Sequence, residues 1–472
     1  MIRSRGRQLA IMAEQWVKVS WLALLCGAVS SCTVFNDVDV CERQAGPARD
    51  VNRHNENDQF FVGTNHLIPT TEDSWLSVWT SDLDATGDAV DKRSDIRVSR
   101  LDAEGTPLGT CGQEAEWTAV TATATSTDQV NNAYDPSLSS PRHAGETYPL
   151  LIWGVDDGST TTLMGQELTP GGCDWDNEPP FVVQQVPGVC SSFAGRARSA
   201  DSRCLLPFRL AALDSSSKGG DQYVLLWEDQ KGFGSPTLMG RVLDYRDGGN
   251  FLPTAANPSG EAGPIFAGSR LPVGFDLIGL DDGHWALAWL ETTLSAQSAW
   301  VQIWDDRLLP VSKPVEIHSG PPPTSILIDA ERVGGDVGVS FVVEGGIYAA
   351  VVSQKDAHVL ARRELPRPAD VDWARMAAAP NEDTVALSWT EGKDRVMVQL
   401  LSRDLVPQFN DQSCDDTPFF VDGGVGTATR QDMAFDADGG LLVTWTSFEA
   451  GGSDRSGAGI RNRYFSADVL KP

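Results

Sequence analysis

The chain has 472 residues, of which 65 are Asp or Glu and 37 are Lys or Arg, so its formal net charge is −28. Hydrophobic residues make up 41% and charged residues 22%, which is typical of a globular protein with a sizeable core and excludes a disordered chain. The acidic excess opposes binding to nucleic acid or to an anionic membrane surface, because both are negatively charged. The 45 Gly and 27 Pro residues favour many turns and an all-β fold.

The N-terminus has the features of a secretory signal peptide. An apolar run at residues 21–29 ends in small residues and is too short to span a bilayer. The basic residues that precede it are Arg3, Arg5, Arg7 and Lys18. Met12 is an alternative start, because residues 1–11 add little to the signal.

Residues 29–32 (VSSC) resemble the lipobox of bacterial lipoproteins. In that family the Cys is acylated on its sulfur and, after cleavage, on its amine, with palmitate as a typical acyl chain. The resemblance implies a lipoprotein signal peptide at residues 1–31 and a lipid anchor at Cys32. Three acyl chains, at roughly 0.8 kcal/mol per buried CH₂ group, give stable anchoring. An ordinary signal peptide with a coincidental Cys is the alternative.

Thr33 stands where an inner-membrane retention signal of such lipoproteins would have Asp, so we expect the outer membrane, on its periplasmic or surface face. Residues 32–57 are polar and lack periodicity, which predicts a flexible tether. Removal of Cys26 and lipidation of Cys32 leave six cysteines: Cys41, Cys111, Cys173, Cys190, Cys204 and Cys414. An even number in an exported protein predicts up to three disulfides, with 15 formal pairings.

An apolar run that ends in an aromatic residue recurs seven times. We name these final residues the marker aromatics: Trp79, Trp153, Trp227, Trp289, Phe341, Trp389 and Trp445. The residues before each marker aromatic are apolar at both even and odd positions. Alternate positions face opposite sides of a strand, so this pattern predicts a strand that is buried on both faces.

Three further strands are predicted around each of these runs. One precedes it, and one follows it and ends in an apolar residue and then Asp, Ser or Thr, which starts a turn. A fourth strand comes after that turn. We therefore predict, over residues 58–472, a seven-bladed β-propeller of four-stranded antiparallel blades. A tandem of β-sandwiches, or a repeat count that is off by one, is the alternative.

The seventh copy stops after its third strand, so another segment has to complete it. We expect Gln59–Gly63 (QFFVG), which precedes the first copy, to supply this outer strand and to close the ring. The copies resemble the WTS…GVYGQRF-like repeats of bacterial surface proteins, most clearly at residues 444–466. This resemblance covers residues 59–472 and carries no catalytic signature.

The expected strand register also suggests disulfide partners. Cys111 and Cys173 would join adjacent blades, and Cys41 and Cys414 would lock the closure of the ring. Cys190–Cys204 would close a loop, which stabilises by about 3 kcal/mol for a loop near 15 residues. A link between Cys173 and Cys190 would break this scheme.

Two long loops are the first candidates for a ligand site. Residues 80–95 and 446–459 belong to the first and seventh copies, which the ring makes neighbours. Asp82, Asp84 and Asp88 match the start of a calcium loop, but Arg93 stands at the closing position, so a solvated hairpin tip is the alternative. No other cofactor is predicted.

A third loop carries a basic cluster. Arg196, Arg198 and Arg203 would bind a carboxylate or sulfate group of a glycan, and a solvated basic loop is the alternative. No GxSxG, HExxH or Walker motif occurs, nor does the SxDxGxTW box of sialidase-like propellers. We therefore predict no catalytic residue.

The sequence thus predicts a lipid-anchored β-propeller of the cell envelope that binds or scaffolds protein partners. Other lipoprotein propellers brace outer-membrane assembly machinery, which places a protein partner first. A glycan-binding or glycan-hydrolysing surface protein that uses the long-loop face is the alternative. Both hypotheses are associational, because propellers host many unrelated activities.

Overall fold

The structure is a computed structural model. The chain divides into two units, Met1–Val40 and Cys41–Pro472, and every residue described here lies in the second. The described residues are 47–51, 58–60, 66–70, 74–82, 94–108, 116–120, 132–140, 149–156, 160–168, 180–187, 207–214, 222–229, 237–246, 250–253, 262–266, 272–292, 296–321, 327–344, 346–366, 371, 373–381, 383–392, 395–408, 418–422, 427–448 and 459–470.

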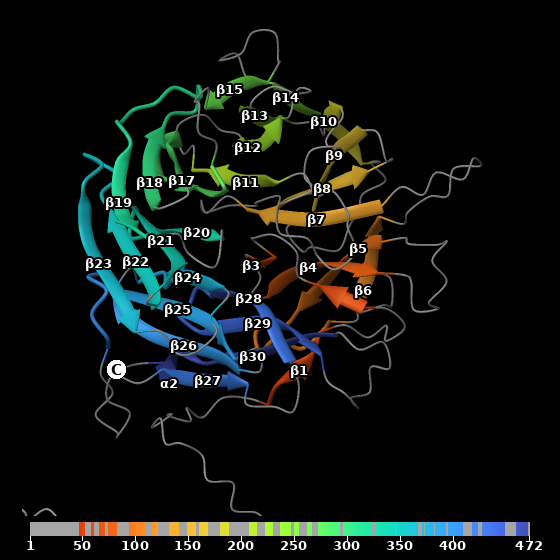
Figure 1. The fold of residues 1–472 in the computed structure, drawn as a ribbon. Helices are drawn as coiled ribbons and strands as arrows, with labels where there is room; N and C mark the ends of the chain where they lie inside the picture. Colours follow the sequence, from red (N-terminus) through yellow and green to blue (C-terminus); the bar gives the residue numbers. More distant parts are fainter. Residues whose placement is uncertain are drawn as a thin grey trace, which may run out of the picture. The chain divides into compact units, whose positions relative to one another are not determined.

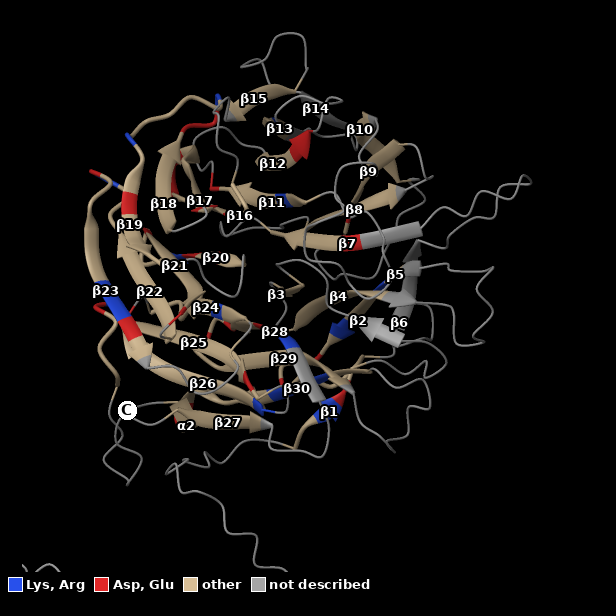
Figure 2. Ribbon diagram, viewed as in Figure 1, with Lys and Arg blue, Asp and Glu red and all other residues tan. Residues whose placement is uncertain are grey.

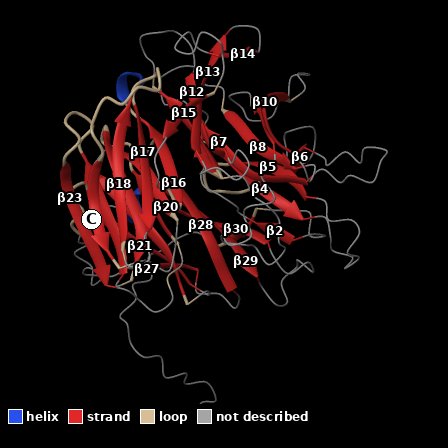
Figure 3. Cartoon of the chain, turned by 45° about the horizontal axis from the view of Figure 1, so that its top comes forward, coloured by secondary structure: helices blue, strands red, loops and turns tan. Residues whose placement is uncertain are grey.

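The second unit is an all-β propeller with seven antiparallel blades around a central axis, as predicted (Figure 1). Five blades have four strands, while blades 1 and 3 each carry one additional short strand. In the part of the chain that the structure describes, no helix has the length and apolarity needed to cross a bilayer. Figure 3 shows how strands dominate the unit.

The strands of the blades are as follows. Blade 1 contains β2 (Asp58–Phe60), β3 (Leu67–Pro69), β4 (Trp75–Asp82), β5 (Ser94–Leu101) and β6 (Glu116–Val120). Blade 2 contains β7 (Asn132–Ser139), β8 (Leu150–Asp156), β9 (Thr160–Glu167) and β10 (Phe181–Pro187). Blade 3 contains β11 (Phe208–Leu213), β12 (Gln222–Asp229), β13 (Thr237–Arg246), β14 (Asn250–Pro253) and β15 (Gly263–Phe266). Blade 4 contains β16 (Gly274–Gly279), β17 (Trp285–Thr292), β18 (Gln297–Trp304) and β19 (Val315–Gly320).

Blade 5 contains β20 (Ile328–Val333), β21 (Asp336–Val343), β22 (Gly346–Val352) and β23 (Val359–Pro366). Blade 6 contains β24 (Ala374–Ala378), β25 (Thr384–Glu391), β26 (Arg395–Ser402) and β27 (Phe419–Asp422). Blade 7 contains β28 (Thr427–Phe435), β29 (Leu441–Phe448), β30 (Gly459–Phe465) and β1 (Arg49–Asp50). Two short helices, η3 (Asp281–Gly283) and α2 (Ala467–Leu470), complete the described elements.

The marker aromatics lie on the second strand of each blade and are buried, which confirms their predicted packing role. On β17, Trp285 and Trp289 pack with residues of blade 3, whereas Ala286 and Ala288 pack with residues of blade 5. Large side chains therefore fill one interface and small ones the other. The core is a set of such layers between neighbouring sheets, because each blade is buried on both faces.

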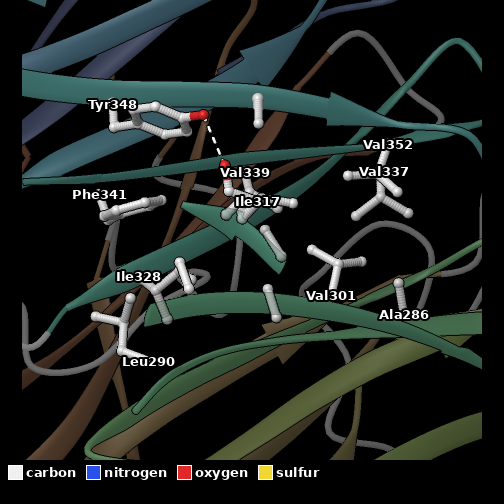
Figure 4. Packing of buried hydrophobic residues seen from close by; sticks show 14 of the residues in the cluster. Ala286, Leu290, Val301, Ile317, Ile328, Val337, Val339, Phe341, Tyr348 and Val352 are labelled. Carbon is white, nitrogen blue, oxygen red and sulfur yellow. Dashed lines mark hydrogen bonds between the residues drawn. The ribbon is translucent and has the colours of Figure 1, made fainter. Parts of the chain in front are cut away.

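The layer between blades 4 and 5 illustrates this packing (Figure 4). Val301 and Ile317 of blade 4 belong to the same buried cluster as Val339 and Phe341 of blade 5. The Tyr348 hydroxyl donates a hydrogen bond of 2.7 Å to the carbonyl oxygen of Ile317, which satisfies the one polar atom of this ring (Figure 4). Apolar contact thus holds adjacent blades together across most of their area.

The ring closes with a different strand from the one expected. The prediction that Gln59–Gly63 completes blade 7 is wrong: β1 pairs with β30, with Arg49 opposite Asn462, and Asp58–Phe60 pairs with β4 in blade 1. β1 lies within the segment for which the sequence predicted a tether. The strand is two residues long and polar, so it lacks the apolar pattern that made Gln59–Gly63 attractive.

Side-chain contacts anchor β1 to the first blade as well. Arg49 donates hydrogen bonds to the Thr106 hydroxyl and to the Glu104 carbonyl oxygen, both in the turn after β5. Val51 is fully buried between blades 7 and 1, and its N–H bonds the carbonyl oxygen of Ile460 at 2.8 Å. The N-terminal segment therefore joins the last blade to the first.

We predict that removing residues up to and including Val51 lowers the free energy of unfolding by at least about 2 kcal/mol, since burial of one such side chain contributes that much. Thermal or denaturant unfolding of the shortened protein would measure the loss. A truncation that ends at residue 46 is the control: it also lacks Cys41, so it shares any loss of a Cys41–Cys414 disulfide, and it should be more stable than the longer truncation by that amount. Equal stability of the two truncations would contradict the closure by β1.

Candidate functional site

Ionisable side chains gather around the axis of the propeller. Six of them occupy one repeated register position, on or next to the innermost strand and opposite the residue that precedes the marker aromatic. We name this set the axial ring: His66, Arg209, Asp276, Asp329, Arg375 and Asp432. Ser137 holds the same position in blade 2. Figure 2 shows charged residues of both signs on the strands around the axis.

The carboxylates of the axial ring bind backbone N–H groups of the next blade. Each innermost strand is the edge of its sheet, so one row of its N–H groups has no strand partner. Asp276 accepts the N–H of Ala330 at 3.0 Å, and Asp329 accepts that of Met376 at 2.6 Å. An acidic side chain in this position therefore satisfies the neighbouring edge.

Asp432 makes the same link from blade 7 to blade 1. It accepts the N–H of His66 at 2.7 Å and that of Leu67 at 3.1 Å. The ring of blades is thus closed at the axis as well as at β1. This inner closure joins residues that are more than 360 positions apart in the chain.

Arginines connect the carboxylates to one another. Arg375 binds Asp329 with one nitrogen and Asp432 at 2.7 Å with another, so it spans blades 5, 6 and 7. Arg209 forms an ion pair of 3.5 Å with Asp276 and thereby joins blades 3 and 4. All five groups have side chains that are nearly or fully buried, so their charges have to be compensated locally.

The carboxyl groups of the ring have contrasting proton affinities. Burial raises the pKa of Asp329 to about 8; the Arg375 guanidinium opposes this shift, while Asp276 and Glu331 add to it. Burial also raises the pKa of Asp276. For Asp432, burial acts upward, but Arg375 and His66 outweigh it and lower the pKa. Asp329 therefore binds a proton more tightly than Asp432 does.

Two β-bulges add a second pair of charges near the axis. Asp135 in β7 and Arg430 in β28 have positive φ angles of 53° and 49° and interrupt the ladder register near their marker aromatics. Asp tolerates this left-handed conformation better than most residues. Burial raises the pKa of Asp135 to about 7, against the opposing effect of Arg209 and Arg430.

A cavity of about 530 Å³ opens where the innermost strands end, and all seven blades contribute to its lining. Arg375 and Asp432 of the axial ring belong to this lining. Small residues such as Ala212, Gly279 and Ala378 leave the space open, and Leu67, Ile278 and Met433 provide apolar wall. A Cβ atom at Gly279 would overlap the Ala212 carbonyl oxygen, so only glycine permits this approach of blades 3 and 4.

Four carboxyl groups, of Asp214, Glu331, Asp432 and Asp436, line the cavity, against the two guanidinium groups of Arg332 and Arg375. Both guanidinium groups contact acidic side chains: Arg375 as described above, and Arg332 through Asp281 and, at 3.5 Å, Asp214. Asp436 accepts a hydrogen bond of 2.8 Å from the Tyr464 hydroxyl. The cavity therefore carries an excess of negative charge.

The cavity defines one end of the blades, which we name the cavity face. The turns after the third strands also emerge there, because strands alternate in direction. Asp102, Asp305 and Ser402 start three of these turns by accepting backbone N–H groups, as predicted. Leu309 and Val406, which precede Pro310 and Pro407 in equivalent turns, are 57% and 50% exposed, and Val311 beside them is 57% exposed.

The long loops predicted to carry a ligand site leave from the opposite face. β4 begins at the cavity face and ends at Asp82, and β29 likewise ends at Phe448. The side chain of Asp82 and the positions of Asp84 and Asp88 lie outside the described residues, as do Arg196, Arg198 and Arg203. Cys32 and the six disulfide candidates lie outside them too. Within the described ranges, no three His, Cys, Asp or Glu side chains are placed to hold a metal ion.

No protein-family model and no curated protein matches the sequence. Among solved structures, a prolyl endopeptidase is similar over 88% of this chain and 48% of its own, with 13% identity and a TM-score of 0.45. The chain thus spans about half the length of that enzyme. A fucose-specific lectin from Aleuria aurantia is similar over 69% of this chain and 93% of its own, with 11% identity and a TM-score of 0.37. The GH93 α-L-arabinofuranosidase of Fusarium graminearum is similar over 90% of this chain and its whole length, with 12% identity and a TM-score of 0.41.

These likenesses concern the fold alone.

The axial ring was not predicted, although the sequence contains a signal for it. The strands that precede the marker aromatics include FDLIGLDD, SILIDAE and QDMAFDA, each with an Asp inside an apolar strand. An acidic residue repeated at a buried strand position requires a partner, and that requirement points to a link between blades.

We predict that stability falls as the pH rises from about 4 through 7, in part because of Asp135. Its pKa is raised to about 7 from an ordinary value of 3.8, so the folded state binds the proton more tightly than the unfolded state. The stabilisation is complete below pH 4 and is lost as Asp135 ionises. Asp135→Asn keeps the neutral shape and tolerates the positive φ angle, so its stability should depend less on pH.

Denaturant unfolding of both proteins between pH 4 and 9 would measure this difference. Asp438→Asn, at an exposed turn, is the control and should follow the wild type. Parallel curves for Asp135→Asn and the wild type would contradict the assignment of a proton to Asp135.

Proposed function

We propose that the protein is an exported lipoprotein, anchored to the outer membrane through Cys32, whose propeller binds or scaffolds a protein partner in the cell envelope. The signal sequence and the VSSC motif support the anchor. The propeller supports the binding role. Its ring of blades is closed both by β1 and by Asp432 at the axis, so it forms a rigid platform for surface loops. A preformed surface of this kind binds without a large loss of conformational entropy.

The axial charges support a structural role for the ring rather than an acid–base role. Asp432 accepts hydrogen bonds from three backbone N–H groups, those of His66, Leu67 and Met433, in addition to its contact with Arg375. A general acid or base has to exchange a proton with its substrate. A carboxylate that is already held by four donors is suited to joining blades.

The observation that carries the proposal is the composition of the cavity face. Leu309, Val311 and Val406 expose about half of their surface at turn tips on the same end of the blades as the cavity. Apolar side chains exposed at the tips of turns can join the buried apolar core of a protein–protein interface. They therefore favour a protein partner over the glycan alternative.

The direction of β1 also supports the cavity face as the place where a partner binds. β1 runs antiparallel to β30, so the chain enters the ring at the cavity face. The segment from Cys32 to Arg49 reaches at most roughly 60 Å when fully extended. A lipid anchor at Cys32 would therefore keep the cavity face within that distance of the bilayer, where membrane-proximal partners are found.

Site-specific photo-crosslinking in intact cells tests this proposal. A crosslinking residue at Leu309 or Val406 should form a discrete adduct with a protein, whereas one at Glu344, in the exposed β21–β22 hairpin on the opposite face, should form none. Cys32→Ser should abolish incorporation of labelled palmitate into the protein, because it removes the sulfur that would be acylated.

Adducts at Glu344 but not at Leu309 or Val406 would move the partner site to the opposite face. That result, together with capture on immobilised envelope glycan, would favour the alternative of a glycan-binding or glycan-hydrolysing protein. A Cys32→Ser protein that incorporates labelled palmitate as the wild type does would contradict the lipid anchor.

A further inference from the structure

We infer that the axial cavity is the recognition site for a basic side chain, a lysine or arginine on an exposed segment of the partner protein. This inference rests on the proposed function, since it names the chemistry by which the cavity face would recognise its partner. It assigns to the cavity a ligand of one charge and one general shape: a positively charged group on an apolar stem.

The shape of the cavity suits a side chain with an apolar stem. Its volume of about 530 Å³ falls within the range of pockets that hold small organic groups, about 300–1,000 Å³. Alanines of blades 3 and 6, including Ala212 and Ala378, leave room beside apolar walls from Ile278 and Met433. Such walls suit the methylene stem of a lysine or arginine, which packs on apolar surface while its head seeks charge.

The lining of the cavity carries more acidic than basic side chains. Asp214, Glu331, Asp432 and Asp436 outnumber Arg332 and Arg375, and both arginines are already held by carboxylates. Neither arginine is therefore positioned as an anion clamp. A cation is the ligand that this lining complements, and the protein's net charge of −28 attracts it from a distance.

Binding of a defined peptide to the full-length mature protein in detergent tests the inference. The probe is a fluorescein-labelled pentapeptide, Ala-Leu-Lys-Leu-Ala, and its control carries norleucine in place of lysine. We expect the lysine peptide to bind at least about tenfold more tightly, a difference of about 1.4 kcal/mol. Equal affinity of the two peptides would overturn the inference.

Two variants of the protein locate the site. Glu331→Gln removes one cavity charge and should weaken the lysine peptide about tenfold, whereas Glu344→Gln, the matched change on the opposite face, should leave affinity unchanged. Ala378→Leu should abolish binding because it fills the cavity. Unfolding temperatures equal to that of the wild type would show that both variants fold. Unchanged affinity in both folded variants would overturn the assignment.

Free cadaverine distinguishes a side chain on a protein from a small amine. It should compete at least tenfold more weakly than the peptide, because it lacks the flanking residues that contact the face. Equal competition would overturn the assignment to a partner segment.

The photo-crosslinking experiment, repeated with the cavity variants, distinguishes failure of this inference from failure of the proposed function. Adducts at Val406 that persist unchanged in Glu331→Gln and Ala378→Leu would overturn the cavity assignment and leave the binding role intact. Peptide binding without any adduct in cells would support the cavity chemistry and contradict the envelope partner.

Discussion

The propeller depends on hydrogen bonds that buried carboxylates accept from the edge of the neighbouring blade. Asp276, Asp329 and Asp432 each reach from one innermost strand to backbone N–H groups of the next. Without them, these groups would be buried at a strand edge with no partner, at a cost of about 1–3 kcal/mol each. The same carboxylates would be too costly to bury alone, so the arginines of the axial ring accompany them.

This arrangement explains why two distant parts of the chain close the ring. At the axis, Asp432 joins blade 7 to the residues just before and within β3. At the outside, β1 pairs with β30, while its Arg49 binds the turn of blade 1. The layers of apolar side chains hold neighbouring blades face to face, and the two closures fix the first blade against the last.

The repeat could be predicted from the sequence because each copy carries its pattern within a short segment of the chain. Seven marker aromatics on strands buried on both faces, each followed by a strand that ends in a turn residue, predict the blades and their number. The closing strand was not readable: Arg49–Asp50 is short and polar, and its identity depends on a partner at the other end of the chain. The neighbouring QFFVG run has a stronger strand pattern and pairs, in part, with β4 instead.

The sequence did not predict the cavity either, because its lining also comes from parts of the chain that are far apart. Residues of seven separate strands line it, and small residues such as Gly279 and Ala378 have no pattern that marks an open space. The sequence drew attention to long loops, whereas the described cavity lies at the other end of the blades. Only the direction of the innermost strands places Glu331 and Asp432 in its lining, while Asp329, on the strand of Glu331, contacts Arg375 of that lining.

Residue-resolved amide hydrogen exchange tests the central role of the carboxylates most directly. The N–H groups of Ala330, Met376 and Leu67 lie on strand edges that face no other strand. We predict that they nevertheless exchange as slowly as amides inside the β-ladders, because neighbouring carboxylates hold them. Exchange as fast as that of amides on the outer edge of β23 would contradict the account.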